Sequence, residues 1–318
     1  MKKRTVDWSR YGILFAWIAL IIVFSLAENS FLSIKNIFNI LRQVAIVGIC
    51  SVGMTFVILT GGMDLSVGSV IGVSAVGGAI MMSSGFPPII AVSVALIIGM
   101  TSGFINAFFI NEVGIAPIIM TLGMMTSLRG VAYILCGGYP VYGIPEEFLI
   151  IGQGYLNVVP VPVIIMLIVF VVGYFILNKT TFGRSVYGIG GNAEASRLSG
   201  VNVKMIIYKI YILAGALYAL AGLILLARVN SGQPKAGDGY EMDVITACVL
   251  GGISVSGGEG RIGGVIIGVL MMGTLTNGMI LMNVPEFWQW VVKGVVLVIA
   301  VTIDQVAKKG RVKASTKA

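Results

Sequence analysis

Long apolar runs alternate with short polar or glycine-rich connectors along almost the entire chain. A helix needs about 20 apolar residues to cross a hydrocarbon core about 30 Å thick, so the pattern predicts an all-α, polytopic membrane protein with about ten transmembrane helices. The predicted spans are 11–27, 44–60, 65–83, 88–110, 115–136, 158–177, 206–227, 244–256, 262–282 and 287–303.

Three of the connectors carry further signals. Residues 31–43 place Lys35 and Arg42 among apolar residues at helical spacing, which predicts a separate short helix at the outer membrane interface. Pro87 and Pro88 mark an outer turn, because proline suits the first turn of a helix but not its interior. The longest polar stretch is 178–205, and it predicts a segment outside the bilayer.

Composition excludes a single soluble globule. Of the 318 residues, 57% are hydrophobic and 11% are charged, and the mean hydropathy is +1.00. Soluble domains carry about 25% charged residues. The spans and their connectors use almost the whole length, so we expect one transmembrane domain over residues 1–318 and no folded domain outside the bilayer.

The net charge of +8 fits either a nucleic-acid surface or the excess of Lys and Arg in cytoplasmic loops. The positions favour the loops, because the positive residues cluster between apolar runs. We therefore expect cytoplasmic termini, a cytoplasmic segment over 178–205, a cytoplasmic tail over 305–318 and no nucleic-acid partner. The clusters are Lys2, Lys3, Arg4 and Arg10; Lys179, Arg184, Arg197 and Lys204; and Lys308, Lys309, Arg311, Lys313 and Lys317.

The sequence lacks the residues of several common chemical sites. It has no histidine, and Cys50, Cys136 and Cys248 stand apart in or beside apolar runs, which indicates packing rather than metal binding. No GxxxxGK[ST] motif is present, so the chain does not bind ATP through that loop. We expect no catalytic residue, no metal site and no cofactor in this chain.

The polar segment contains a candidate contact for a soluble partner. Asn192 is a favourable N-cap residue and Gly200 is favourable at the C-terminal end of a helix, which predicts a helix of about two turns between two spans. Such a helix can press on a cytoplasmic protein, although a solvated connector that only orients the chain remains the alternative. The candidate residues are Gly191, Asn192, Ala193, Glu194, Ala195, Ser196, Arg197, Leu198, Ser199 and Gly200.

Two glycine-rich turns resemble each other at an offset of 190 residues, LTGGMDLSVG at 59–68 and VLGGISVSGG at 249–258. Glycine allows close approach of backbones, and Asp64 or Ser254 can cap the next helix. These turns are candidates for an inner gate of a path, with two compact hairpins as the alternative. The candidate gate residues are Gly61, Gly62, Asp64, Ser66, Gly251, Gly252, Ser254 and Ser256.

Arg129 and Lys293 are cations inside apolar runs without an obvious acidic partner nearby in sequence. Such residues face a water-filled path, a subunit interface or, by snorkelling, the lipid headgroups. Asp243 precedes an apolar run and is expected to cap its helix; with Asp238 and Glu241 it is alternatively a cation site or an extracellular contact.

Four motifs together resemble one family. They are TGGMDLSVGS (60–69), YGIGGNAEASRLSGVNV (187–203), SGQPKAGDGYEMDVITACVLGGISVSGGEGRIGG (231–264) and FWQWVVKGVV (287–296). In this order they resemble the permease subunits of ABC importers for ribose and related monosaccharides.

The resemblance implies a bacterial inner-membrane permease that works as a homodimer or heterodimer, with a cytoplasmic ABC ATPase and an external sugar-binding protein. ATP and Mg would be bound by the ATPase, and residues 191–200 would form the coupling helix that contacts it. Which sugar is carried, and which residues bind it, stays open. An ion-gradient-driven secondary transporter is the alternative function, and a membrane-embedded enzyme lacks a catalytic pair.

Overall fold

The computed structural model describes residues 8–315, in which nearly all regular structure is helical. The basic residues Lys2, Lys3, Arg4 and Lys317 lie outside the described residues. The helices are α1 (Trp8–Ala27), α2 (Ile34–Leu59), α3 (Val67–Ser83), α4 (Pro88–Phe108), the π-helix η1 (Phe109–Val113), α5 (Pro117–Cys136), α6 (Glu146–Gln153), α7 (Val161–Lys179), α8 (Thr181–Gly191), α9 (Ala193–Leu198), α10 (Val203–Val229), α11 (Tyr240–Leu250), α12 (Ile262–Leu281) and α13 (Glu286–Ser315).

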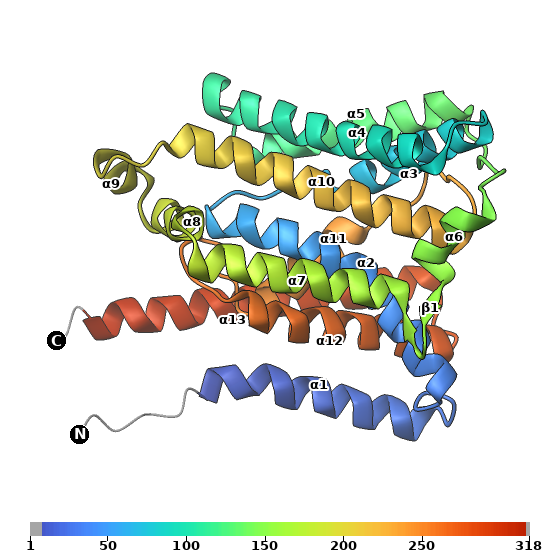
Figure 1. Ribbon diagram of the computed structural model, residues 1–318. Helices are drawn as coiled ribbons and strands as arrows, with labels where there is room; N and C mark the ends of the chain where they lie inside the picture. Colours follow the sequence, from blue (N-terminus) through green and yellow to red (C-terminus); the bar gives the residue numbers. More distant parts are fainter. Residues whose placement is uncertain (1–7, 316–318) are drawn as a thin grey trace.

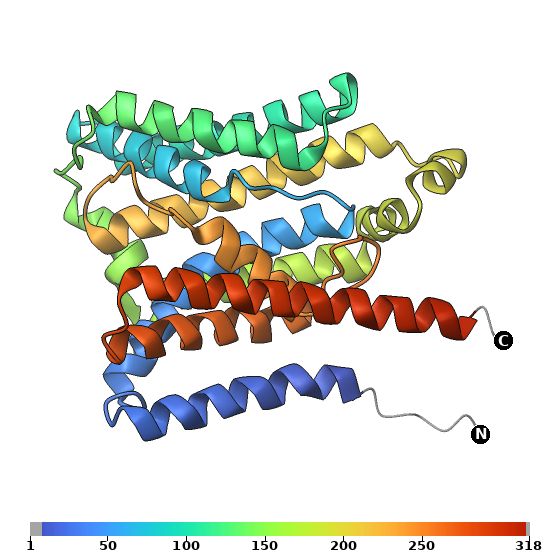
Figure 2. The ribbon, with the colours of Figure 1, turned by 180° about the vertical axis from the view of Figure 1, so that it is seen from behind.

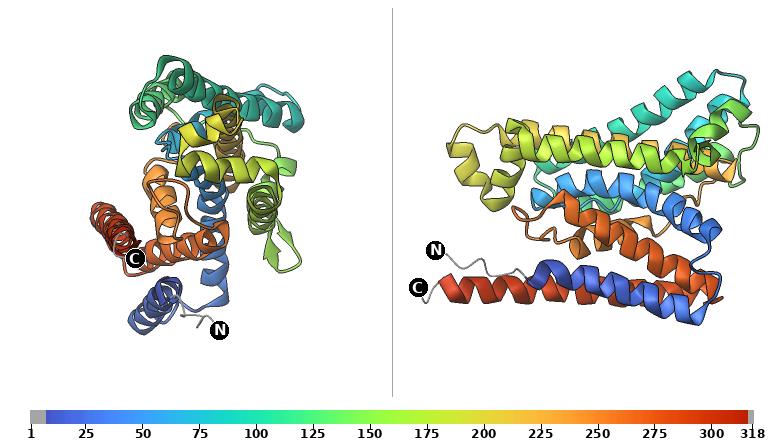
Figure 3. Two further views of the ribbon diagram at one scale, coloured as in Figure 1. Left: turned by 90° about the vertical axis from the view of Figure 1, so that its left-hand side faces the viewer. Right: turned by 60° about the horizontal axis from the view of Figure 1, so that its bottom comes forward.

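The long helices run side by side as a bundle with two distinct ends (Figure 1). One end carries α8 and α9, and α1 begins and α13 ends on that side. The other end carries α6 and a small antiparallel hairpin of β1 (Tyr155–Leu156) and β2 (Val159–Pro160). Viewed along the bundle, α8 lies across the end rather than along it (Figure 3, left).

Seven described helical segments are long and apolar enough to cross a membrane: α2, α4 with η1, α5, α7, α10, α12 and residues 286–306 of α13. The apolar helices at 12–27 and 67–83 are shorter. The predicted span 244–256 is wrong in its bounds, because α11 ends at Leu250 and residues 251–261 are not helical. Its 11 residues make a rise of only about 16 Å.

The predicted separate helix at 31–43 is also wrong. Helix α2 runs without a break from Ile34 to Leu59. Ser33 accepts a hydrogen bond from the Asn36 N–H at its start, and no glycine or proline interrupts the junction at Gln43 and Val44. The interfacial stretch is therefore the first part of a longer helix.

Helices α2 and α10 form the centre of the bundle, where their inner portions are almost completely buried. Helix α10 packs most extensively on α4. A Cβ atom on Gly103 of α4 would overlap the Tyr211 carbonyl oxygen of α10, so the two backbones are in direct contact.

Two non-helical stretches interrupt the helical bundle. Residues 60–66 lead from α2 into α3, and residues 251–261 lead from α11 into α12. Figure 2 shows both between α5 and α13, on the side of the bundle that faces the viewer. We call them the first and the second discontinuous segment. Discontinuous helices are where membrane transporters commonly expose backbone groups and form their sites.

Candidate functional site

The polar segment folds into two short helices, α8 and α9, which project from one end of the bundle (Figure 1). Helix α9 is the short helix predicted from the sequence. Asn192 Oδ1 accepts a hydrogen bond from the Ala195 N–H at 2.8 Å, and Gly200 follows the helix with a φ of 86°. The predicted start and stop are thus confirmed. Helix α8 was not predicted, and Thr180 caps it by accepting from the Gly183 N–H.

Glu194 and Arg197 pair with each other on the exposed surface of α9. The Arg197 Nη2 atom lies 2.6 Å from Glu194 Oε1, and the side chains are 64% and 65% exposed, respectively. The hydrogen bonds and charge of Arg197 lower the pKa of the Glu194 carboxyl, and Glu194 in turn raises the pKa of Arg197. A soluble protein that reaches α9 would meet a charged pair that is already aligned.

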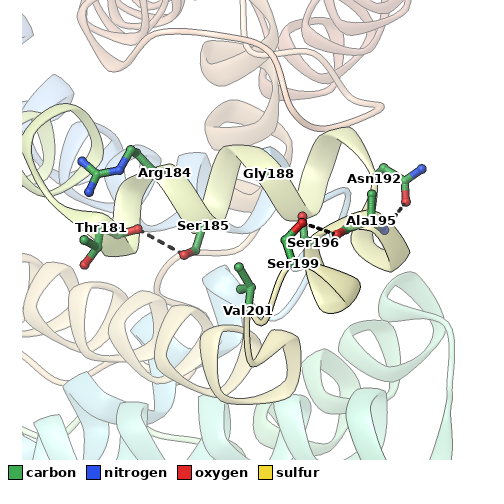
Figure 4. Close-up of a pocket in the computed structure, with 9 residues that line it drawn as sticks. All are labelled: Thr181, Arg184, Ser185, Gly188, Asn192, Ala195, Ser196, Ser199 and Val201. Atoms are coloured by element: carbon green, nitrogen blue, oxygen red, sulfur yellow. Dashed lines mark hydrogen bonds between the residues drawn. The ribbon is translucent and has the colours of Figure 1, made fainter.

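A shallow hollow separates α8 from α9 and is rich in hydroxyl groups (Figure 4). Ser185 donates to the Thr181 carbonyl, and Ser199 donates to the Ala195 carbonyl. These contacts keep the hydroxyl groups against their own helices. The lining residues are Thr181, Arg184, Ser185, Gly188, Asn192, Ala195, Ser196, Ser199 and Val201.

Helices α2 and α11 end in the same backbone pattern. Gly62 and Gly61 donate to the carbonyls of Val57 and Ile58, and Ile253 and Gly252 donate to those of Cys248 and Val249. Gly61 and Gly252 have φ values of 79° and 83°, conformations that only glycine adopts at little cost. The two turns therefore match at an offset of 191 residues, and the sequence-based pairing of Gly61 with Gly251 is one residue out of register.

The two discontinuous segments touch each other. The Gly258 N–H donates to the Leu59 carbonyl at 2.9 Å, and a Cβ atom on Gly257 would lie 2.7 Å from the Gly61 nitrogen. Residues about 200 positions apart in sequence thus share a backbone hydrogen bond where the first segment begins. A gate built from both segments would move as one unit.

Buried polar groups hold the first segment in place. Asp64 accepts from the Ser66 N–H and hydroxyl at 2.9 and 2.6 Å, just before α3 begins. Asn106 of α4 donates to the Ser66 hydroxyl at 3.3 Å. Thr121 of α5, which sequence reasoning missed, accepts from the Leu65 N–H at 3.1 Å. Asp64 thus stabilises the turn before α3, but the predicted helix cap is wrong, because the N-cap residue is Ser66 and that cap has no side-chain hydrogen bond.

Ser254 does not cap the next helix, because α12 starts only at Ile262. Its N–H donates to the Glu259 carbonyl, and its hydroxyl donates to Asp304 of α13 at 3.3 Å. Ser256 is exposed on the same segment. The second segment is thus anchored to α13 through Ser254, whereas Ser256 is exposed on its surface.

Arg129 and Lys293 hold the chain around α11 from two sides. Arg129 Nη1 donates to the carbonyls of Pro234 and Ala236 at 2.6 and 2.9 Å, in the loop before α11. Lys293 Nζ lies 2.8 Å from Asp243 Oδ2. The predicted capping role of Asp243 is wrong, because α11 begins earlier, at Tyr240, and Asp243 lies within the helix. The sequence offered no obvious acidic partner for Lys293, and the fold supplies Asp243 as one.

Comparison with known proteins identifies the family. A family model described as branched-chain amino acid transport system / permease component matches residues 36–301. The ribose import permease protein of Bacillus subtilis (strain 168) is 47% identical over 288 residues, which cover 90% of this chain and 89% of that protein. The chain belongs to this permease family. The sequence-based resemblance to ribose-type importer permeases is thereby confirmed.

The permease also resembles transport proteins for other pentoses. The xylose transport system permease protein of Haemophilus influenzae (strain ATCC 51907 / DSM 11121 / KW20 / Rd) is 34% identical over 373 residues, covering 97% of this chain and 99% of that protein. The L-arabinose ABC transporter permease protein of Azospirillum brasilense is 36% identical over 303 residues, covering 95% and 89%. No solved structure matches the permease.

Family membership and the seven apolar segments agree that the permease is a multi-pass membrane protein. Its relatives are named as transport components rather than as enzymes. The structure brings the two glycine-rich turns together and sets α8 and α9 at one end of the bundle.

Proposed function

We propose that this chain is the transmembrane subunit of an ATP-driven importer and forms the path for a monosaccharide such as ribose. The observation that carries the proposal is the 47% identity to a ribose import permease over 90% of the chain. An uncharged sugar needs no strong charges along its path, so the scarcity of charged residues in the apolar runs is consistent with this substrate class.

Transport by this subunit would require partners. A second permease chain, identical or related, would complete the path, and an extracytoplasmic binding protein would deliver the sugar. A cytoplasmic ABC ATPase would bind ATP and Mg and supply the free energy. The chain itself would have neither an ATPase site nor a catalytic residue.

The proposed roles follow the geometry of the segments. Residues 191–200, which include α9, would dock in the ATPase, because they project from the bundle and carry an exposed pair of charges. The two discontinuous segments, with Gly61, Gly62, Asp64, Ser66, Gly251, Gly252, Ser254 and Ser256, would flank the inner gate. Arg129 and Lys293 would support the path from α5 and α13.

The proposed topology places both termini in the cytoplasm of a bacterium and the permease in its inner membrane. Helices α1, α3 and the shorter α11 would then also cross the membrane, which together with the seven long segments gives about ten crossings. Helix α9 lies at the same end of the bundle as the beginning of α1 and the end of α13, which supports this arrangement (Figure 1).

Reconstitution in proteoliposomes tests the proposal. With a cognate ATPase and binding protein, labelled ribose should enter only when ATP and the binding protein are present. The permease alone, given a proton or sodium gradient, should transport nothing. Uptake by the permease alone would contradict the proposal and identify an ion-driven transporter.

A further inference from the structure

We propose that Gly190 is a positioning residue for transport, because its bare Cα lets the end of α8 rest on the hydrogen bond that joins the end of α2, where the first discontinuous segment begins, to the second discontinuous segment. A shift of α9 would then reach both segments at one point. The inference rests on the proposed function and names the contact through which the ATPase would act on the path.

The contact consists almost entirely of backbone atoms. The Leu59 carbonyl at the end of α2 accepts from the Gly258 N–H at 2.9 Å. A Cβ atom on Gly190 would overlap both of these atoms, the Leu59 oxygen and the Gly258 nitrogen. Gly190 therefore lies directly against the hydrogen bond itself, at a distance that no other residue type permits.

Glycines from the second segment complete the junction. A Cβ atom on Gly257 would lie 2.7 Å from the Gly61 nitrogen and 3.2 Å from the Gly190 Cα atom. A Cβ atom on Gly258 would lie 2.7 Å from the Gly191 nitrogen. Three stretches of chain thus meet without an intervening side chain that could change rotamer, which makes the contact stiff.

A second contact reinforces the first. The Tyr187 hydroxyl of α8 donates to the Gly260 carbonyl of the second segment at 3.1 Å. Tyr187 and Gly190 lie three residues apart, so they occupy one face of α8. Only Gly191 and the cap residue Asn192 lie between Gly190 and the start of α9. A displacement of α9 would therefore pass to the junction through two residues of backbone.

A helical glycine away from the junction provides the matched control. A Cβ atom on Gly123 of α5 would have no atom within 4 Å. Gly190→Ala forces the junction apart, whereas Gly123→Ala adds the same methyl group in open space. The two substitutions have similar effects on helix propensity, so their difference reports the contact.

The experiment compares these variants in the reconstituted transporter with its ATPase and binding protein. We measure ATP hydrolysis, its stimulation by sugar-loaded binding protein, and sugar uptake. Gly190→Ala should retain hydrolysis but show several-fold lower uptake per ATP and weaker stimulation. Gly123→Ala should match the wild type in all three. Wild-type coupling in an assembled Gly190→Ala transporter would overturn the inference.

Tyr187→Phe provides the decisive result if Gly190→Ala does not assemble. It removes the hydrogen bond to Gly260 without adding volume, and it should lower uptake per ATP while the thermal stability of the purified complex stays near that of the wild type. Wild-type coupling in Tyr187→Phe would then overturn the inference. A wild-type transporter that is inactive in this assay would instead refute the proposed function.

Discussion

The ion pair of Lys293 and Asp243 is the most strongly buried charge pair found among the described residues. The side chains are only 19% and 9% exposed, and within the described chain Asp243 Oδ1 has no hydrogen-bond partner. Removing one member of a buried pair leaves the other charge uncompensated. The pair therefore ties the short helix α11 to α13 at a position where a single substitution is costly.

Lys293→Met should destabilise the purified permease by about 3–5 kcal/mol, because Asp243 keeps its buried charge without a partner. Adding Asp243→Asn to Lys293→Met should recover much of this loss. Thermal unfolding in detergent measures both effects, with Lys235→Met, at an exposed lysine, as control. Equal stability of the single and double variants would show that the pair is not electrostatically coupled.

The charged pair on α9 tests the docking of the ATPase. Glu194→Gln with Arg197→Gln removes both charges but keeps side chains with good helix propensity. The double variant should retain less ATPase on co-purification and lose coupled uptake, because the charge-assisted contacts to the partner disappear. Glu147→Gln with Lys235→Gln, two exposed charges nearer the opposite end, serves as control.

Full coupled transport by the α9 double variant would exclude these two side chains as docking contacts. It would leave open docking through the backbone and the small side chains of the same helix.

At the residue scale, the sequence identified special side chains but not their partners. Arg129 and Lys293 stood out because cations are rare within apolar runs. Their contacts come from residues 105 and 50 positions away, and they form because α5 lies against the loop before α11 and α13 packs on α11. Thr121 carried no signal, since a single threonine in an apolar helix is common.

At the scale of elements, glycine positions decide how closely α4 and α10 pack. Cβ atoms on Gly99 and Gly215 would each overlap the carbonyl oxygen of the other residue. Gly99 and Gly103 are spaced by four positions, so they lie on one face of α4. The spacing is a known signal for close helix packing in membranes, and it could have been found from the sequence.

Gly99→Ala should separate α4 from α10 and destabilise the permease by about 1–3 kcal/mol, the usual cost of overpacking. Gly123→Ala on α5 adds the same methyl group where no atom lies within 4 Å, so it should stay within about 0.5 kcal/mol of the wild type. Thermal unfolding in detergent distinguishes them. Equal stabilities would contradict the proposed tight crossing.

The elements that the sequence predicted well are those with a clear apolar pattern. Helices α4, α5, α7 and α12 begin and end within a few residues of the predicted spans. The errors fall where tertiary contacts replace local signals: α2 extends through its polar start, and the chain after Leu250 leaves the helix at Gly252. The two glycine-rich turns were paired one residue out of register, because the sequence comparison aligned identical residues and could not see the hydrogen bonds that define the turns.

At the scale of the whole molecule, the two ends of the bundle differ in charge and structure. Lys179, Arg184, Arg197 and Lys204 lie in or beside α8 and α9 at one end, where α13 also ends with Lys308, Lys309, Arg311 and Lys313 (Figure 1). Among the described residues the opposite end holds fewer, namely Lys35, Arg42, Arg228 and Lys235. Positive residues are enriched in cytoplasmic loops. The sequence could predict this difference in charge, but not that the end of α8 rests on the junction between the end of α2 and the second discontinuous segment.

Accessibility of single cysteines checks the sidedness directly. With Cys136 replaced by Ala, cysteines at Ser199 after α9 and at Val306 on α13 should react with a membrane-impermeant maleimide only in inside-out vesicles. A cysteine at Asn157 in the hairpin should react only from outside intact cells, because it lies at the opposite end of the bundle (Figure 1). Because the substituted positions are exposed, the variants should fold, and sugar uptake by each variant checks that they do. Reaction of Ser199→Cys and Asn157→Cys from the same side would contradict the topology, and reaction of Val306→Cys from outside would place an odd number of crossings between α9 and the carboxyl end.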